Sequence, residues 1–142
     1  MRAPDELTTL FRENGLKVTP QRRAVFEALH QDAMHPTADV IFARLRANMP
    51  TVSLRTVYQA LNDLIELGEI QAVWVGNGAA RFDPNVSHHD HFICRSCERI
   101  YDVVASRPTL VSAEADGVDD TADYVVDSAE IFFRGLCASC VA

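Results

Sequence analysis

The chain has 142 residues, which suffices for one medium domain or two small ones, and its hydrophobic content of 48% is ordinary for a globular protein. No apolar run approaches the length of a membrane span, so we do not expect a membrane protein. The net charge of −7 argues against a uniformly basic nucleic-acid binder, yet residues 1–84 carry nine Lys and Arg against ten Asp and Glu, whereas residues 85–142 carry four against ten. The sequence therefore indicates a near-neutral first half and an acidic second half.

Start and stop signals predict four helices in the first half. Pro4 opens the first helix, and Thr19-Pro20, Thr37 and Ser53 open the others, because Thr and Ser cap helices and Pro suits the first helical position. Stop signals are Gly15 for the first helix, Pro50 for the third and Gly68 for the fourth. Residues at helical spacing give each helix an apolar stripe: Leu7, Leu10 and Phe11; Val25, Phe26 and Leu29; Val40, Ile41 and Leu45; Val57, Ala60, Leu61, Leu64 and Ile65.

A β-hairpin is predicted directly after the fourth helix. Residues 70–75 and 79–82 are rich in β-formers and are joined through Gly76-Asn77-Gly78, which is a typical hairpin turn. Helices followed by such a hairpin have the layout of a winged helix-turn-helix.

The polar face of the fourth helix is the candidate DNA-reading surface. Its side chains suit contacts to base edges and phosphates: Arg55, Thr56, Tyr58, Gln59 and Asn62. Basic residues near the second helix and on the hairpin could neutralise phosphates: Lys17, Arg22, Arg23 and Arg81. The alternative is an ordinary solvated helix face, which any exposed helix has. The helix pair, the hairpin and the basic cluster together favour DNA, with a dimer needed for specific binding.

The composition changes after Phe82. Residues 83–87 form a turn-rich connector that we interpret as a hinge. Strands are then predicted from His89 into Cys94, over residues 100–104 and over residues 124–136, with a weakly indicated helix at 106–117 and an acidic loop at 116–123. The second half is thus a small α+β unit, and pairing its strand edges across a two-fold axis would give a dimer.

Four cysteines form two Cys-x-x-Cys pairs, Cys94/Cys97 and Cys137/Cys140. Two chelating pairs supply four soft ligands for a tetrahedral ion, which is the coordination of structural zinc. The alternative is two disulfides in a secreted protein, but the chain does not open with a charged segment followed by an apolar one, and an intracellular setting keeps thiols reduced. We therefore expect a zinc site that supplies part of the folding free energy of the second half.

A second metal site is indicated just before the first cysteine pair. His89 and His91 lie two apart on one face of a strand, with Asp83 and Asp102 near in sequence. Imidazole and carboxylate ligands suit Fe(II), Mn(II), Zn(II) or Ni(II). Histidine clusters are also common as surface imidazoles, and the cysteine cluster alongside favours the metal site.

Several short motifs together resemble the ferric uptake regulator family. They are Val18-Thr19-Pro20-Gln21-Arg22, His35-Pro36-Thr37-Ala38, Thr56-Val57-Tyr58, Arg81-Phe82-Asp83 and His88-His89-Asp90-His91 ahead of Cys94. The resemblance runs from about residue 7 to Cys140. It implies a dimeric, metal-responsive transcriptional repressor in the cytoplasm, with a winged-helix domain at 1–82, a hinge at 83–88 and a metal-binding dimerisation domain at 89–142.

The resemblance also implies a sensing site with five ligands. They fall here on His35, Asp83, His89, His91 and Asp102. Asp at the hinge position resembles the peroxide-sensing branch, in which Fe(II) and peroxide oxidise a liganding histidine, whereas Mn(II) would support repression without that response. The segment from Ala129 to Cys137 resembles actinobacterial members that repress catalase-peroxidase.

Two departures from the family pattern stand out. The region before the last strand reads Val126-Asp127-Ser128 where many relatives have a histidine, so a complete third metal site using His88 or Asp90 is not expected. Glu98 stands where a glycine is usual, at a position that favours positive φ.

Other functions remain as alternatives. An iron- or zinc-uptake regulator without peroxide sensing would share the fold, and a zinc-stabilised protein-interaction module would lack DNA binding. An enzyme is not expected, because the four-cysteine set is closed and no catalytic metal motif is present.

Overall fold

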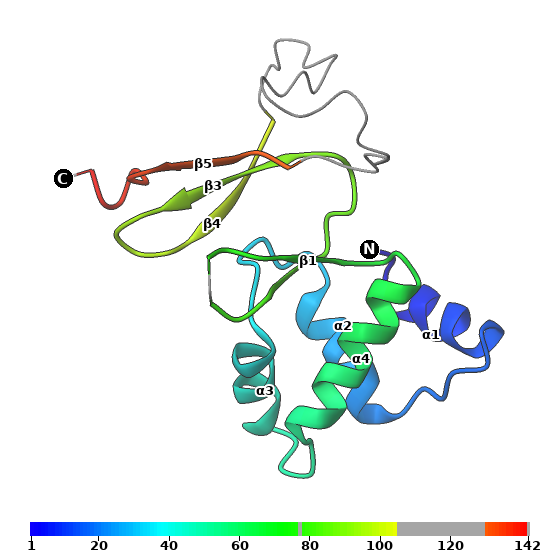
Figure 1. Cartoon of the computed structure of the whole chain (residues 1–142). Coiled ribbons are helices and arrows are strands. Elements are labelled where there is room, and N and C mark those ends of the chain that lie inside the picture. The colour runs from blue at the N-terminus through cyan, green and yellow to red at the C-terminus, as the bar shows by residue number, and fades with distance from the viewer. Residues whose placement is uncertain (77, 105–129, 142) are drawn as a thin grey trace, which may run out of the picture. The chain divides into compact units, whose positions relative to one another are not determined.

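The computed structural model describes residues 1–76, 78–104 and 130–141. They form two compact units, Met1–Ser87 and His88–Ala142. The first unit holds four helices and a small hairpin, and the second holds a three-stranded sheet (Figure 1). Within these described ranges, no helix combines the length and apolar character needed to cross a bilayer.

All four predicted helices are present with the predicted caps. They are α1 (Pro4–Glu13), α2 (Pro20–Leu29), α3 (Ala38–Arg46) and α4 (Leu54–Glu66). The side chains of Thr19, Thr37 and Ser53 each accept a hydrogen bond from the backbone N–H three residues on, at 3.3, 3.3 and 3.1 Å. Each cap satisfies a backbone donor that the helix leaves open, which fixes where its helix begins.

The helices enclose one hydrophobic core. Its buried residues are Leu7, Phe11, Val25, Phe26, Leu29, Ala38, Ile41, Val52, Val57, Ala60, Leu61, Leu64, Ile70 and Phe82. Two stripe predictions were wrong, because Val40 is 42% exposed and Ile65 is 36% exposed. Both lie at the margin of their helix's apolar face, where the sequence pattern cannot tell core from rim, and Ala38 takes the buried place in α3.

The hairpin is shorter than predicted. β1 (Gln71–Val73) pairs antiparallel with β2 (Arg81–Asp83), with Ala72 opposite Phe82. An isolated bridge joins Thr37 to Arg81, and the Phe82 N–H donates to the Pro36 carbonyl at 3.0 Å. The loop before α3 is therefore fastened along the outer edge of β2.

The second unit is a sheet in the order β4-β3-β5. β3 (Asp90–Cys94) pairs antiparallel with β4 (Ile100–Val103) and parallel with β5 (Phe132–Gly135). Of the predicted strand over residues 124–136, the part before residue 130 lies outside the described residues, as do the predicted helix at 106–117 and the acidic loop at 116–123.

Candidate metal centres and nucleic-acid interface

The parallel pairing of β3 with β5 brings the two cysteine pairs together. Cys94 ends β3 opposite Gly135, and Cys137 follows β5 two residues later. Parallel strands end at the same edge of a sheet, so both Cys-x-x-Cys turns project from one edge. The four sulfur atoms all lie within 4.8 Å of one another; they belong to Cys94, Cys97, Cys137 and Cys140.

The spacing of the sulfurs fits a zinc ion. Four sulfurs bonded to one zinc at about 2.3 Å lie about 3.8 Å apart in a tetrahedron. Here the Sγ atoms of Cys97 and Cys137 lie 3.7 Å apart, and all four cysteines are free thiols rather than disulfides. The donor set and its spacing therefore fit the predicted structural zinc.

Backbone donors already favour the thiolate form that a metal requires. The Cys137 N–H points at the Cys94 sulfur at 3.4 Å. Backbone hydrogen bonds from Cys97 and then Cys137 lower the pKa of the Cys94 thiol to about 6. Such bonds orient the ligand and stabilise its negative charge.

The first cysteine turn needs a left-handed residue, as the sequence indicated. Glu98 has φ of 58°, and its N–H donates to the Cys94 carbonyl at 2.9 Å. Since a glycine adopts this conformation at less cost, Glu98 adds strain to the turn that the surrounding contacts must offset.

Two of the predicted regulatory ligands lie together in the first unit. His35 precedes the loop held along β2, and Asp83 is the last residue of β2. The His35 Nε2 atom lies 3.7 Å from an Asp83 carboxylate oxygen, and both side chains are almost fully buried. His35 also has φ of 49°, a rare conformation for a non-glycine residue that is typical of functional sites.

The orientation of Asp83 depends on a residue that the sequence analysis missed. The Gln71 side-chain amide donates to Asp83 Oδ2 at 2.9 Å and to the Asn85 carbonyl at 2.9 Å. The Asn85 N–H donates to Asp83 Oδ1 at 2.7 Å. Gln71 faces Asp83 across the β1–β2 ladder, a pairing that only the hairpin register discloses.

The other three predicted ligands lie together in the second unit. His91 and Asp102 are direct partners in the β3–β4 ladder, and His89 precedes β3. The Nε2 atoms of His89 and His91 are 3.0 Å apart, and His89 Nε2 is 3.6 Å from Asp102 Oδ1. Two ring nitrogens bonded to one ion at about 2.1 Å lie about 3.0 to 3.4 Å apart, so these donors fit a shared cation.

The predicted DNA-reading face of α4 is accessible. Arg55 and Gln59 are exposed, and Tyr58 is 40% exposed. Thr56 is half-buried and its hydroxyl contacts the capping Ser53 hydroxyl at 2.8 Å. The apolar face of α4 is packed in the core, so its polar residues project away from it.

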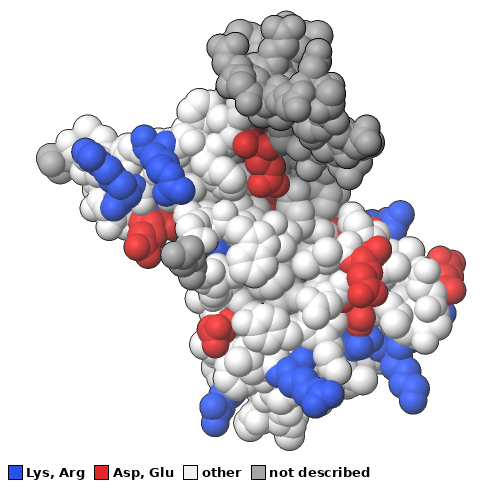
Figure 2. Space-filling view, in the orientation of Figure 1, with Lys and Arg blue, Asp and Glu red and all other residues white. Residues whose placement is uncertain are grey.

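The basic residues near α2 differ from one another in their surroundings. Lys17 is exposed, whereas Arg22 pairs with Asp63 at 2.7 Å with only 17% of its side chain exposed. Arg23 pairs with Asp5 at 2.8 Å and with Glu27 at 3.0 Å. Arg22 thus ties α2 to α4 within the unit. On the face shown in Figure 2, basic and acidic side chains are interspersed.

Comparison with known proteins places this arrangement in a family. The sequence profile described as the ferric uptake regulator family matches residues 13–119. The chain belongs to this family. It is 34% identical over 140 residues to the peroxide-responsive repressor PerR of Staphylococcus saprophyticus, covering 96% of this chain and 89% of that protein. The predicted family membership is therefore confirmed.

Solved structures agree on the fold. The ferric uptake regulator Fur of Helicobacter pylori, described as having three functional metal-binding sites, superposes with a TM-score of 0.71 at 24% identity, covering 96% of this chain and 89% of that one. PerR from Streptococcus pyogenes, whose structure is described as the basis for peroxide sensing and gene regulation by that protein, superposes with a TM-score of 0.55 at 26% identity. The match covers 99% of this chain and 94% of that one.

These relationships confirm the predicted fold class: α+β, with an N-terminal winged helix-turn-helix and a small C-terminal unit carrying the four-cysteine cluster. They also establish the chain as a metal-dependent regulator of this family.

Proposed function

We propose that this regulator is a cytoplasmic homodimeric repressor that binds a two-fold symmetric DNA operator when metal is bound. Lys17, Arg55, Thr56, Tyr58 and Gln59 contact the DNA, and Arg22 supports α4 through Asp63. The exposed polar face of α4 and the naming of relatives as repressors support this proposal. The N-terminal turn of a recognition helix is where base contacts concentrate.

Two kinds of metal take part in the proposal. Zinc at Cys94, Cys97, Cys137 and Cys140 stabilises the second unit. Fe(II) or Mn(II) is the regulatory ion, with ligands from His35, Asp83, His89, His91 and Asp102. The observation that carries the regulatory site is the spacing of the His89 and His91 ring nitrogens, 3.0 Å apart, with Asp102 beside them.

The ligand set suggests how metal controls DNA binding. His35 and Asp83 belong to the first unit, and the other three ligands belong to the second. An ion that takes ligands from both would restrict the angle between the units, and thus between the two recognition helices of a dimer. Without the ion, the fraction of molecules able to span two half-sites falls, so metal acts as corepressor.

Peroxide would reverse this control through a histidine ligand. A bound Fe(II) would supply the redox chemistry that activates hydrogen peroxide. Overall, one peroxide oxygen is added to the imidazole of His35 or His89 and the other leaves as water, so the ring is oxidised by two electrons, the peroxide is reduced by two, and the ring loses its value as a ligand. Curated relatives are named peroxide-responsive repressors, which supports this proposal over a plain iron- or zinc-uptake regulator.

A fluorescence anisotropy titration on operator DNA tests the proposal. We expect tight binding with Fe(II) or Mn(II), weak binding without either, and release by peroxide only in the Fe(II) form. Mass spectrometry should then find one added oxygen on a histidine peptide, with zinc retained. Oxygen only on Cys or Met would favour an uptake regulator, and absent DNA binding would favour an interaction module. DNA binding that is equally tight without metal would contradict the role of the metal as corepressor.

The hinge ligand offers a second check. Asp83→Glu keeps a carboxylate but lengthens the side chain, which moves the ligand oxygens relative to His35. We expect metal-dependent DNA binding to persist while the peroxide response is blunted. A variant released by peroxide as fast as the wild type would remove Asp83 from the explanation of peroxide sensing.

A further inference from the structure

The middle strand of the second unit gives His91 two very different neighbours. β3 lies between β4 and β5, and in the two ladders His91 is paired with Asp102 on one side and with Phe132 on the other. Paired residues of adjacent strands point to the same face of a sheet, so these three side chains share one face. Asp102 is a predicted ligand, whereas the proposed function gives Phe132 no role.

The Phe132 ring is stacked on the imidazole of His91. The two ring centroids are 5.8 Å apart and the planes differ by 20°, which is within the range of attractive aromatic pairs. The His89 ring meets the same imidazole edge-on, with centroids 4.6 Å apart and an interplanar angle of 70°. His91 is only 1% exposed. Its imidazole is therefore held by neighbouring rings as well as by its place on the strand.

Rotation of the His91 imidazole about its Cβ–Cγ bond decides where its Nε2 atom points. This torsion is soft, because it joins a tetrahedral carbon to a planar ring and has broad minima. In the structure the ring is turned so that Nε2 lies 3.0 Å from the His89 Nε2 atom. Tilting the imidazole out of this plane would break the stack with Phe132 and carry Nε2 away from His89. The stacking contact therefore favours the orientation that a shared cation needs.

We propose that Phe132 is a positioning residue of the regulatory metal site, whose ring holds the His91 imidazole in the orientation that binds the ion. The proposal rests on the proposed function, which assigns a metal to His91 and its neighbours. A ligand that occupies the competent orientation for only part of the time weakens the apparent affinity in proportion to that fraction. A stacked aromatic pair favours one arrangement by about 3- to 10-fold. Loss of the Phe132 ring should therefore lower metal affinity by a factor of this size.

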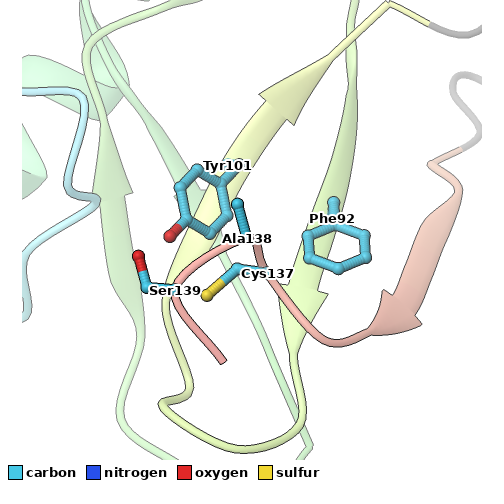
Figure 3. Close-up of a pocket in the computed structure, with 5 residues that line it drawn as sticks. All are labelled: Phe92, Tyr101, Cys137, Ala138 and Ser139. Atoms are coloured by element: carbon cyan, nitrogen blue, oxygen red, sulfur yellow. The ribbon is translucent and has the colours of Figure 1, made fainter. Parts of the chain in front are cut away.

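Phe133 offers a matched control, because it is the next residue of β5 and faces the other way. It is paired with Phe92, on the side of the sheet opposite His91. Phe92 also lines an open pocket of about 380 Å³ beside the second cysteine turn, together with Tyr101, Cys137, Ala138 and Ser139 (Figure 3). The same substitution at Phe132 and at Phe133 therefore changes the same strand and differs in which face loses its ring.

The test compares full-length, zinc-loaded wild type with Phe132→Leu and Phe133→Leu. Isothermal titration calorimetry measures the Mn(II) affinity, and the ligand-field absorption of Co(II) added to the zinc-loaded protein reports the geometry of the regulatory ligands. In Phe132→Leu we expect an Mn(II) affinity about 3- to 10-fold lower and an altered Co(II) spectrum, with the zinc content unchanged. Phe133→Leu should match the wild type in both measurements. Phe132→Tyr keeps an aromatic ring and should restore the affinity and the spectrum.

The proposal is overturned if Phe132→Leu has the affinity and spectrum of the wild type, if Phe133→Leu loses as much, or if Phe132→Tyr binds as weakly as Phe132→Leu. Should Phe132→Leu lose its zinc or its fold, Phe132→Met, which has a flexible side chain without a ring, is judged by the same two measurements. The wild type tests the proposed function separately. A wild type that binds neither Mn(II) nor Co(II) beyond the cysteine site would remove both proposals, whereas equal binding by wild type and Phe132 variants removes only this one.

Discussion

Single side chains beyond the predicted ligands decide how well each candidate metal site is formed. Asp83 is held by the Gln71 amide and the Asn85 backbone, so its carboxylate is oriented before any metal binds. The sequence pattern identified Asp83 but not Gln71, because the pairing of β1 with β2 is what brings them together. Ligand motifs in a sequence show the donors, whereas the groups that orient donors depend on register.

Gln71→Leu tests this support. The change removes the amide that holds Asp83 while keeping a side chain of similar size. We expect the affinity for Mn(II) to fall by about 10-fold, as is typical when an outer partner of a ligand is lost. Isothermal titration calorimetry measures the Mn(II) affinity, and the zinc content of the variant should equal that of the wild type. Gln21→Leu, the same change in α2, should leave the Mn(II) affinity as in the wild type; equal affinity in both variants would contradict the role of Gln71.

Arg55 and Lys17 should differ in what they contribute to DNA binding. Arg55→Ala should weaken specific binding by roughly 1–3 kcal/mol if it reads a base. Lys17→Ala should weaken binding to all sequences and reduce the salt dependence by about one unit of slope. Fluorescence anisotropy titrations with operator DNA and with random DNA, each over a series of salt concentrations, distinguish these two effects. An equal loss on both DNAs in Arg55→Ala would rule out base reading.

Arg22 has a different expected effect from the one that its position near α2 first indicated. Because its guanidinium is committed to Asp63, Arg22→Ala should lower the thermal stability of the first unit as well as DNA affinity. The melting temperature of Arg22→Ala, set beside that of Lys17→Ala, measures this. A melting temperature equal to that of the wild type would show that the ion pair is unimportant for the fold.

At the scale of elements, local signals predicted the helices well and the strands less well. Caps and apolar spacing act over three or four residues, so the starts of α2, α3 and α4 could be read from Thr19, Thr37 and Ser53. The parallel pairing of β3 with β5 joins segments about 40 residues apart, and no local pattern specifies it. The cysteine spacing predicted a cluster, while this pairing decided which edge of the sheet carries it.

The close approach of β5 to Phe92 makes Gly135 sensitive to substitution. A Cβ at Gly135 would meet the Phe92 ring at 3.1 Å, so Gly135→Ala forces the ring to move. We expect a destabilisation of about 1 kcal/mol, measured by thermal unfolding of the zinc-loaded protein. Gly78→Ala is the control, since its nearest neighbour there is 3.6 Å away, and it should change stability less. If Gly135→Ala melted at the same temperature as Gly78→Ala, the Phe92 ring would be able to move aside without a loss of stability.

For the whole molecule, the two units depend on different sources of stability. The first unit has a continuous hydrophobic core, whereas the described part of the second unit is a three-stranded sheet with its cysteine turns at one edge. The described sheet buries little apolar surface, so we expect a metal bound at the cysteine turns to supply folding free energy that packing of the sheet does not.

Removing zinc should therefore unfold the units unequally. Treatment with a strong chelator should abolish strand signal from the second unit, while the first unit stays folded. Trp74 is the sole tryptophan and lies in the first unit, so its emission reports that unit alone. Limited proteolysis should then leave a fragment near residues 1–87. Adding zinc back, but not Mn(II), should restore the fold of the second unit. If the second unit stayed resistant to proteolysis without zinc, the expected dependence of its fold on zinc would be contradicted.

The sequence alone determined the helices, the exposed polar face of α4, the family resemblance and the candidate metal donors, because capping, periodicity and ligand chemistry are properties of neighbouring residues. Tertiary structure decided that Arg22 is committed to Asp63 and that Gln71 orients Asp83. Each of these contacts joins residues distant in the chain. Strand register and helix packing create them, and neither is encoded in any short stretch of sequence.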